Sequence, residues 1–124
     1  YRKGMAAMEL QLLEAGDNFT HVALIGKLDM AGVDAISGEF QAAVAGRGNP
    51  AIVDLSQVDF MASMGMGMLV NAARTLKQQG RPMVLLRPQP LVAGALELVK
   101  IHLVIPIVDT LEEAFRICQE ELPS

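Results

Sequence analysis

The stretch that most constrains the fold runs from residue 51 to residue 76, because its apolar residues change their spacing partway along. Residues 51–55, Ala-Ile-Val-Asp-Leu, read as a short buried strand. Beyond them, apolar residues recur three or four positions apart, the spacing of one helix face: Met66, Leu69, Val70, Ala73 and Leu76. A tight turn between the two segments presents the hydroxyl of Ser63 where the helix is expected to begin.

Ser63 has two interpretations at this position. The start of a helix carries unpaired backbone N–H groups and a partial positive charge. A serine there either caps the helix with its hydroxyl or offers a favourable place for a phosphate group. The function expected for the chain depends on which interpretation holds.

Strands and helices alternate along the rest of the chain. Strands are expected at residues 8–14, 20–25, 51–55, 82–86 and 105–108. Helices are expected from Asp29 to the glycines at 46–48, from Ser63 to about Gly80, from Pro88 or Pro90 to Val99, and from Asp109 or Thr110 onward. The third helix is expected to turn Leu91, Ala95, Leu98 and Val99 inward, and the fourth Leu111, Ala114, Phe115, Cys118 and Leu122. Thr110 and Glu113 fit a capping box.

This order, ββαβαβαβα, predicts an α/β fold. Strands that alternate with helices imply a mixed, mostly parallel sheet with right-handed crossovers and helices packed on it, and the opening hairpin adds one antiparallel pair. A chain of 124 residues fits one domain. We place that domain at residues 8–122 and expect residues 1–7 to be an N-terminal extension or a remnant of cloning.

Composition argues against several classes of protein. The net charge is −4 and the basic residues are scattered, so we expect no nucleic-acid partner. No apolar run reaches the roughly 18 residues that a membrane span needs, so direct membrane insertion is not expected. The first residues do not resemble a signal peptide, and a cytoplasmic location is the expectation.

The chain also lacks the groupings on which most enzymes depend. His21 and His102 have no partner at metal-ligand spacing, and a single cysteine, Cys118, is best read as a small buried hydrophobe. Ser63 has only half of a nucleophile elbow and no evident histidine partner. Asp54 is expected to hydrogen-bond near Ser56 in a structural role. We therefore expect no catalytic activity, no metal and no cofactor.

Three segments together resemble the STAS domain. They are Gly-Lys-Leu-Asp at 26–29, Val-Asp-Leu-Ser at 53–56, and Phe-Met-Ala-Ser-Met-Gly-Met-Gly at 60–67. The family includes bacterial anti-sigma factor antagonists and the cytoplasmic tails of sulfate transporters. The resemblance runs from about Met8 to Glu121, and it rests on the order and spacing of short motifs.

The resemblance implies a binding switch. In such antagonists a serine at the strand-to-helix turn is phosphorylated by a partner that is both anti-sigma factor and serine kinase, of the histidine-kinase-like ATPase type. Unphosphorylated antagonist binds that partner and frees the sigma factor. Carried over, the phosphoacceptor falls on Ser63, the glycines of the turn on Gly65 and Gly67, and the acidic residue of the second loop on Asp29.

The chain departs from the family pattern at two positions. Ala62 stands where an acidic residue is typical, and Met64 stands where a second hydroxyl is common. Both departures favour an alternative: a non-phosphorylated accessory or scaffold subunit, for example of a lipid-transport ABC system. A third hypothesis, a small-molecule or nucleotide site, rests only on the turn from Gly65 to Gly67.

The expected docking surface is the 61–67 turn together with the outer face of the helix that follows. Four of the eight methionines lie between Met61 and Met68, and methionine suits a surface that adapts to a partner. We expect Met64 and Met68 at the surface, which would also allow a weak homodimer, and leave Met61 and Met66 open between surface and core. The predicted partner-binding residues are Asp29, Met61, Ala62, Met64, Gly65, Met66, Gly67, Met68, Asn71 and Thr75.

Overall fold

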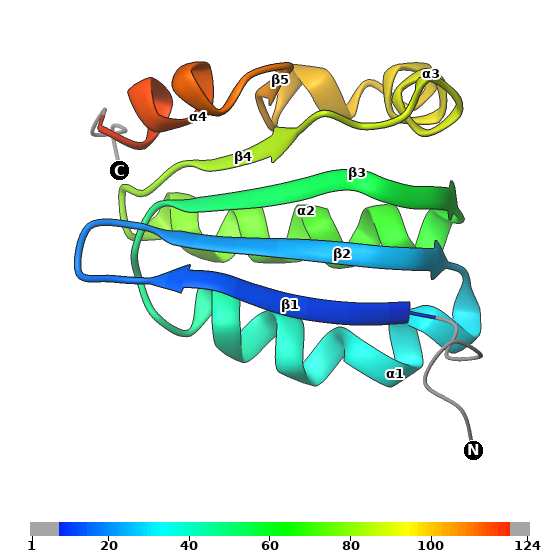
Figure 1. Ribbon diagram of the computed structural model, residues 1–124, viewed down its shortest axis with the longest axis horizontal. Coiled ribbons are helices and arrows are strands. Elements are labelled where there is room, and N and C mark those ends of the chain that lie inside the picture. Colours follow the sequence, from blue (N-terminus) through cyan, green and yellow to red (C-terminus); the bar gives the residue numbers. More distant parts are fainter. Residues whose placement is uncertain (1–7, 120–124) are drawn as a thin grey trace.

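A five-stranded sheet in the order β1-β2-β3-β4-β5 forms the centre of the molecule (Figure 1). The structure is a computed structural model, and it describes residues 8–119. The strands are β1 (Met8–Ala15), β2 (Thr20–Leu28), β3 (Ala51–Met61), β4 (Met83–Leu86) and β5 (Ile107–Val108). The helices are α1 (Met30–Phe40), the π-helical turn η2 (Gln41–Ala45), α2 (Ser63–Gln78), α3 (Pro90–Leu98), the 3₁₀ turn η3 (Ile101–Leu103) and α4 (Leu111–Cys118).

The strand directions are those that the sequence predicted. β1 pairs with β2 in the antiparallel sense, and each later pair, from β2–β3 to β4–β5, is parallel. The prediction of an α/β fold with a mixed, mostly parallel sheet is therefore confirmed. Because β2 and β3 run side by side in the same direction, both end at the same edge of the sheet (Figure 1).

Apolar side chains fill both faces of the sheet. Those on one face, such as Val53 and Leu85, pack with Phe40 and Leu69 on the α1 and α2 side. Those on the other face, such as Ile52, pack in a smaller cluster with residues of α4. Figure 1 shows α4 on the far side of β4 from α1 and α2. α1 and α2 are thus held firmly against the sheet, and their first turns have a fixed position.

Two strands are longer than the sequence pattern predicts. β3 was expected to end at Leu55, but it continues to Met61, and β2 continues to Leu28. Register shifts between Ala23 and Ile25 and between Gly26 and Lys27 interrupt the alternation of buried and exposed residues, so the sequence pattern did not show the last residues of either strand. The carboxylate of Asp54 accepts a hydrogen bond from the Ser56 amide (2.8 Å) across the first of these shifts, which confirms the structural role predicted for Asp54.

The face that α3 buries differs from the prediction. Leu91 and Leu98 were expected in the core, but their side chains are 72% and 84% exposed, and Val99 is exposed too. Val92 and Leu96 are buried instead. Nearly every residue of this helix is apolar, so its spacing defined no single stripe, and the position of the sheet decided which face turned inward.

The fourth helix follows the prediction where the structure describes it. Ala114 and Cys118 are buried, and the hydroxyl of Thr110 accepts a hydrogen bond from the Glu113 amide (3.1 Å). The predicted inward position of Leu122 lies outside the described residues. Among residues 8–119, no helix is both long enough and apolar enough to cross a membrane.

Candidate functional site

The edge of the sheet at which β2 and β3 end gathers most of the residues that the sequence singled out. Leu28 lies opposite Met61 in the last register pair, and the Ala62 amide donates a hydrogen bond to the Leu28 carbonyl (2.9 Å). α1 and α2 both begin directly after these residues. Two helix N-termini, with their free N–H groups, therefore meet at one edge of the sheet.

Ser63 is the first residue of α2 rather than its cap. Ala62 occupies the cap position with an extended backbone (φ −92°, ψ 170°) and supplies no side-chain hydrogen bond. The Ala62 carbonyl accepts hydrogen bonds from the amides of Gly65 (3.0 Å) and Met66 (3.2 Å). Ser63 is exposed, and within residues 8–119 its hydroxyl makes no hydrogen bond. The capping interpretation of Ser63 is therefore wrong.

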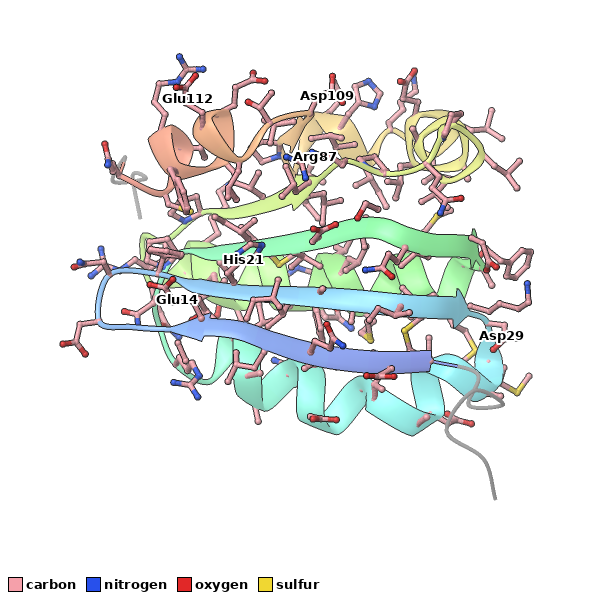
Figure 2. All side chains as sticks on the ribbon, viewed as in Figure 1. Glu14, His21, Asp29, Arg87, Asp109 and Glu112 are labelled. Atoms are coloured by element: carbon pink, nitrogen blue, oxygen red, sulfur yellow. The ribbon has the colours of Figure 1, made fainter. Side chains whose placement is uncertain are left out.

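Asp29 caps the neighbouring helix. Its carboxylate accepts a hydrogen bond from the Gly32 amide (2.8 Å), so α1 begins where the sequence predicted, with Asp29 as its cap. The side chain is half-buried, and Figure 2 shows it at the opposite end of the sheet from Glu14. The structure therefore places a fixed negative charge at the same edge as Ser63.

The two glycines of the turn serve different purposes. A Cβ on Gly65 would lie 3.0 Å from both the Cβ and the carbonyl oxygen of Leu28, and 3.3 Å from the Met61 Cγ. Gly65 is therefore needed where α2 crosses the end of β2. A Cβ on Gly67 would meet no atom within 4 Å. The absence of a side chain at Gly67 only leaves the surface of α2 open.

The methionines do not form the exposed cluster that we expected. Met68 was predicted at the surface, but it is only 7% exposed, and Met61 is buried to the same extent. Met66 packs against the core, and Met64 alone among the four is well exposed, at 46%. α2 turns Gly65, Met68, Ala72 and Leu76 inward. The prediction of a weak homodimer depended on an exposed Met68. Because Met68 is buried, that argument for a homodimer no longer holds.

A shallow hollow of about 280 Å³ lies between α1 and α2, close to Ser63. It is lined by Val33 and Ser37 of α1, by Gln41 at the start of η2, and by Met64, Gly67, Met68 and Asn71 of α2. Met68 is largely buried, but it forms part of the wall of this hollow. Exposed Asn71 lines the hollow as well, so both residues remain in the predicted partner surface. Predicted Thr75 lies outside the hollow, and its hydroxyl donates to the Asn71 carbonyl (3.1 Å).

Several residues of this region were missed by the sequence reasoning. Val33, Ser37 and Gln41 recur at steps of four, which marks one side of a helix, but only the packing of α1 against α2 shows what that side faces. Met30 and Phe60 are exposed apolar residues next to Asp29 and at the end of β3. Met30 directly follows the 26–29 motif, and Phe60 opens the 60–67 motif, but neither was predicted to bind a partner.

The charged and nucleophilic side chains bear on what chemistry the fold could support. A Lys27–Asp59 ion pair (3.4 Å) is exposed to solvent. No cluster of three or more His, Cys, Asp and Glu side chains that could hold a metal occurs in the described part of the chain. The thiol of Cys118 is on the α4 side of the sheet, and burial raises its pKa to about 11, which makes it unreactive at neutral pH.

Comparison with known proteins identifies the family. A profile of the STAS domain matches residues 12–114. The chain belongs to the STAS domain family. A search of curated proteins found no match to the sequence.

Solved STAS structures share this fold. An anti-sigma factor antagonist from Mycobacterium paratuberculosis aligns with a TM-score of 0.81 at 22% identity, over 94% of this chain and 97% of that one. An anti-sigma-factor antagonist (STAS) domain protein from Planctomyces limnophilus gives 0.72 at 23%, over 90% and 97%. Phosphorylated SpoIIAA from Bacillus gives 0.65 at 24%, over 87% and 97%. At these identities the likeness establishes a shared fold.

Proposed function

We propose that this STAS domain is an anti-sigma factor antagonist that works as a binding switch. Unphosphorylated, it would sequester a partner that is both anti-sigma factor and serine kinase, of the histidine-kinase-like ATPase type. Phosphorylation of Ser63 would release that partner. The observation that carries the proposal is the exposed Ser63 hydroxyl, which has no hydrogen bond in the described chain. Ser63 directly precedes Met64 and lies one helical turn before Gly67, and both of these residues line the hollow between α1 and α2.

The domain itself should tolerate a phosphate on Ser63. A phosphate adds about −1.5 to −2 charges, and the first turn of a helix is where such a charge is stabilised. The amides of Ser63 and Met64 at this end of α2 carry no backbone partner among residues 8–119. The charge would therefore change the surface of the domain while its fold stayed the same.

A docked partner would not tolerate that phosphate. A partner seated on Met64 and in the hollow would cover Ser63, so the phosphate would be buried without a counter-ion. The fixed charge of Asp29 at the same edge adds repulsion. A loss of ~3 kcal/mol would weaken binding more than a hundredfold, which is enough for a switch without a change of shape.

The test is capture of partners from a lysate of the source cell with four baits. They are the wild type, Ser63→Asp, Ser63→Ala and Asn18→Asp, and the last adds one negative charge at the exposed turn between β1 and β2. We expect an anti-sigma factor of the kinase type on every bait except Ser63→Asp. Incubation of the captured kinase with ATP should then phosphorylate the wild type and not Ser63→Ala, as read by mass spectrometry.

One feature favours the scaffold alternative. Ala62 supplies no side-chain hydrogen bond at the cap of α2, where the family typically has an acidic residue. If Ser63→Asp retains the partner of the wild type, and that partner is a transporter ATPase, the chain is an accessory subunit and Ser63 is not a switch. Loss of the partner on Asn18→Asp as well would show a response to net charge and would also contradict the proposal.

A further inference from the structure

A second and larger hollow lies away from the edge just described. It measures about 780 Å³ and is formed by the C-terminal half of α2, the segment from η3 to Pro106, and Ile117 of α4. This volume falls within the range of small-molecule sites, roughly 300–1,000 Å³. No residue that lines it belongs to the proposed partner surface.

The walls of this hollow combine apolar and basic side chains. Its apolar lining includes Val70, Met83, Leu103, Val104, Ile105 and Ile117. Its polar lining consists of Arg74, Lys77, Arg81 and His102, with no acidic residue. In a chain with a net charge of −4, this local excess of basic groups is a distinct feature.

The two kinds of side chain are ordered along α2. Val70, Ala73, Arg74 and Lys77 follow one another at helical spacing, so one face of α2 changes from apolar to basic over about 10 Å. Neither Arg74 nor Lys77 has an ion-pair partner among residues 8–119. The position of Lys77 near the end of α2 suits the helix dipole, but the dipole does not explain the apolar wall beside it.

The opposite wall leaves large apolar side chains in water. Leu103 and Val104 are 70% and 67% exposed, and both line the hollow. A ligand in the hollow would cover part of this surface. The basic side chains call for a negatively charged group on that ligand. The change from apolar to basic residues along α2 calls for an apolar part beside that group.

We propose that this hollow binds an anionic amphiphile, with its acyl chain against Val70, Leu103 and Ile105 and its acidic headgroup at Arg74 and Lys77. The inference is independent of the proposed switch at Ser63. It concerns a monomeric amphiphile, such as a fatty carboxylate, in solution.

Titration calorimetry with dodecanoate, kept below the concentration at which it forms micelles, tests this site. We expect saturable binding with one molecule per chain. Dodecyltrimethylammonium, which has the same chain and the opposite charge, should bind at least tenfold more weakly. The double variant Arg74→Gln/Lys77→Gln should weaken dodecanoate binding about tenfold, and Leu103→Ser about fivefold, because each removes one half of the recognition.

The matched control is Lys27→Gln, which removes one exposed positive charge at the far edge of the sheet and should leave dodecanoate affinity unchanged. Equal affinity for the two amphiphiles, or an equal loss in Lys27→Gln, would overturn the assignment. So would binding to phosphatidylglycerol vesicles without binding to monomeric dodecanoate, because that result indicates a membrane-facing surface. The midpoint of urea unfolding is measured for every variant. An unchanged midpoint shows that the variant is folded, so that a difference in affinity reflects the binding site.

Discussion

At the scale of single residues, the proposed site depends on which residues already make hydrogen bonds or close packing contacts within the fold and which do not. Asp29 is committed to the Gly32 amide, and Gly65 to its close contact with Leu28. Ser63 and Gly67 have no such commitment in the described chain. A partner could therefore contact or modify Ser63 and Gly67 without breaking an interaction that stabilises the fold.

The two glycines of the turn should therefore respond in opposite ways to the same substitution. Gly65→Ala would push a Cβ against the Leu28 carbonyl and is expected to lower the free energy of unfolding by about 1–3 kcal/mol. Gly67→Ala meets nothing and should raise it by up to about 1 kcal/mol, through helix propensity. Urea denaturation of both variants measures the difference, and equal effects would contradict the packing described for Gly65.

His21 should make stability depend on pH. Burial lowers the pKa of His21 below its ordinary value of 6.5, and Arg87 lowers it further, while nearby Asp54 and Glu14 act in the opposite direction. The unfolded chain then binds a proton at a higher pH than the folded chain does, so the stabilisation is present above pH 6.5 and is lost as pH falls.

The measurement is a comparison of the wild type with His21→Gln. Urea unfolding at pH 7.5 and at pH 5 should show a larger fall in the free energy of unfolding for the wild type than for the variant. Parallel falls in the two proteins would indicate that other groups, and not His21, cause the acid sensitivity.

At the scale of elements, α3 shows how far an apolar pattern can mislead. Its sequence offers apolar residues in every direction, and the structure buries Val92 and Leu96 while Leu91 and Leu98 face water. α4, by contrast, alternates charged and apolar residues and buries the predicted positions Ala114 and Cys118. The sequence predicts which face of a helix is buried only when the polar residues of that helix lie on one side.

A pair of substitutions in α3 tests this orientation. Leu96→Ala should lower the free energy of unfolding by about 2–5 kcal/mol, because Leu96 is fully buried. Leu98→Ala should change it by less than about 0.5 kcal/mol, because the side chain is already in water. Thermal or urea unfolding of the two variants decides the matter, and a reversed order would mean that α3 buries the face first predicted.

At the scale of the whole molecule, we propose that residues 8–122 form a complete folding unit. β1 begins at Met8 and α4 reaches Cys118, and the sheet and its two apolar clusters lie between them. A chain of residues 8–122 should therefore unfold in urea with the midpoint of the longer chain. A fall in the free energy of unfolding of more than about 1 kcal/mol would show that residues 1–7 or 123–124 contribute to the stability of the fold, and would contradict the proposal.

The sequence by itself determined the order of elements, the mixed sheet and the position of the turn at Ser63. These features depend on neighbours within a few residues: apolar spacing, glycines, and caps such as Asp29 and Thr110. Only the tertiary structure decided that the Ser63 hydroxyl makes no capping hydrogen bond, that Met68 lies inside, and that Val33 and Gln41 share a hollow with Met64. Such facts depend on which surfaces meet across the fold, and no local pattern carries that information.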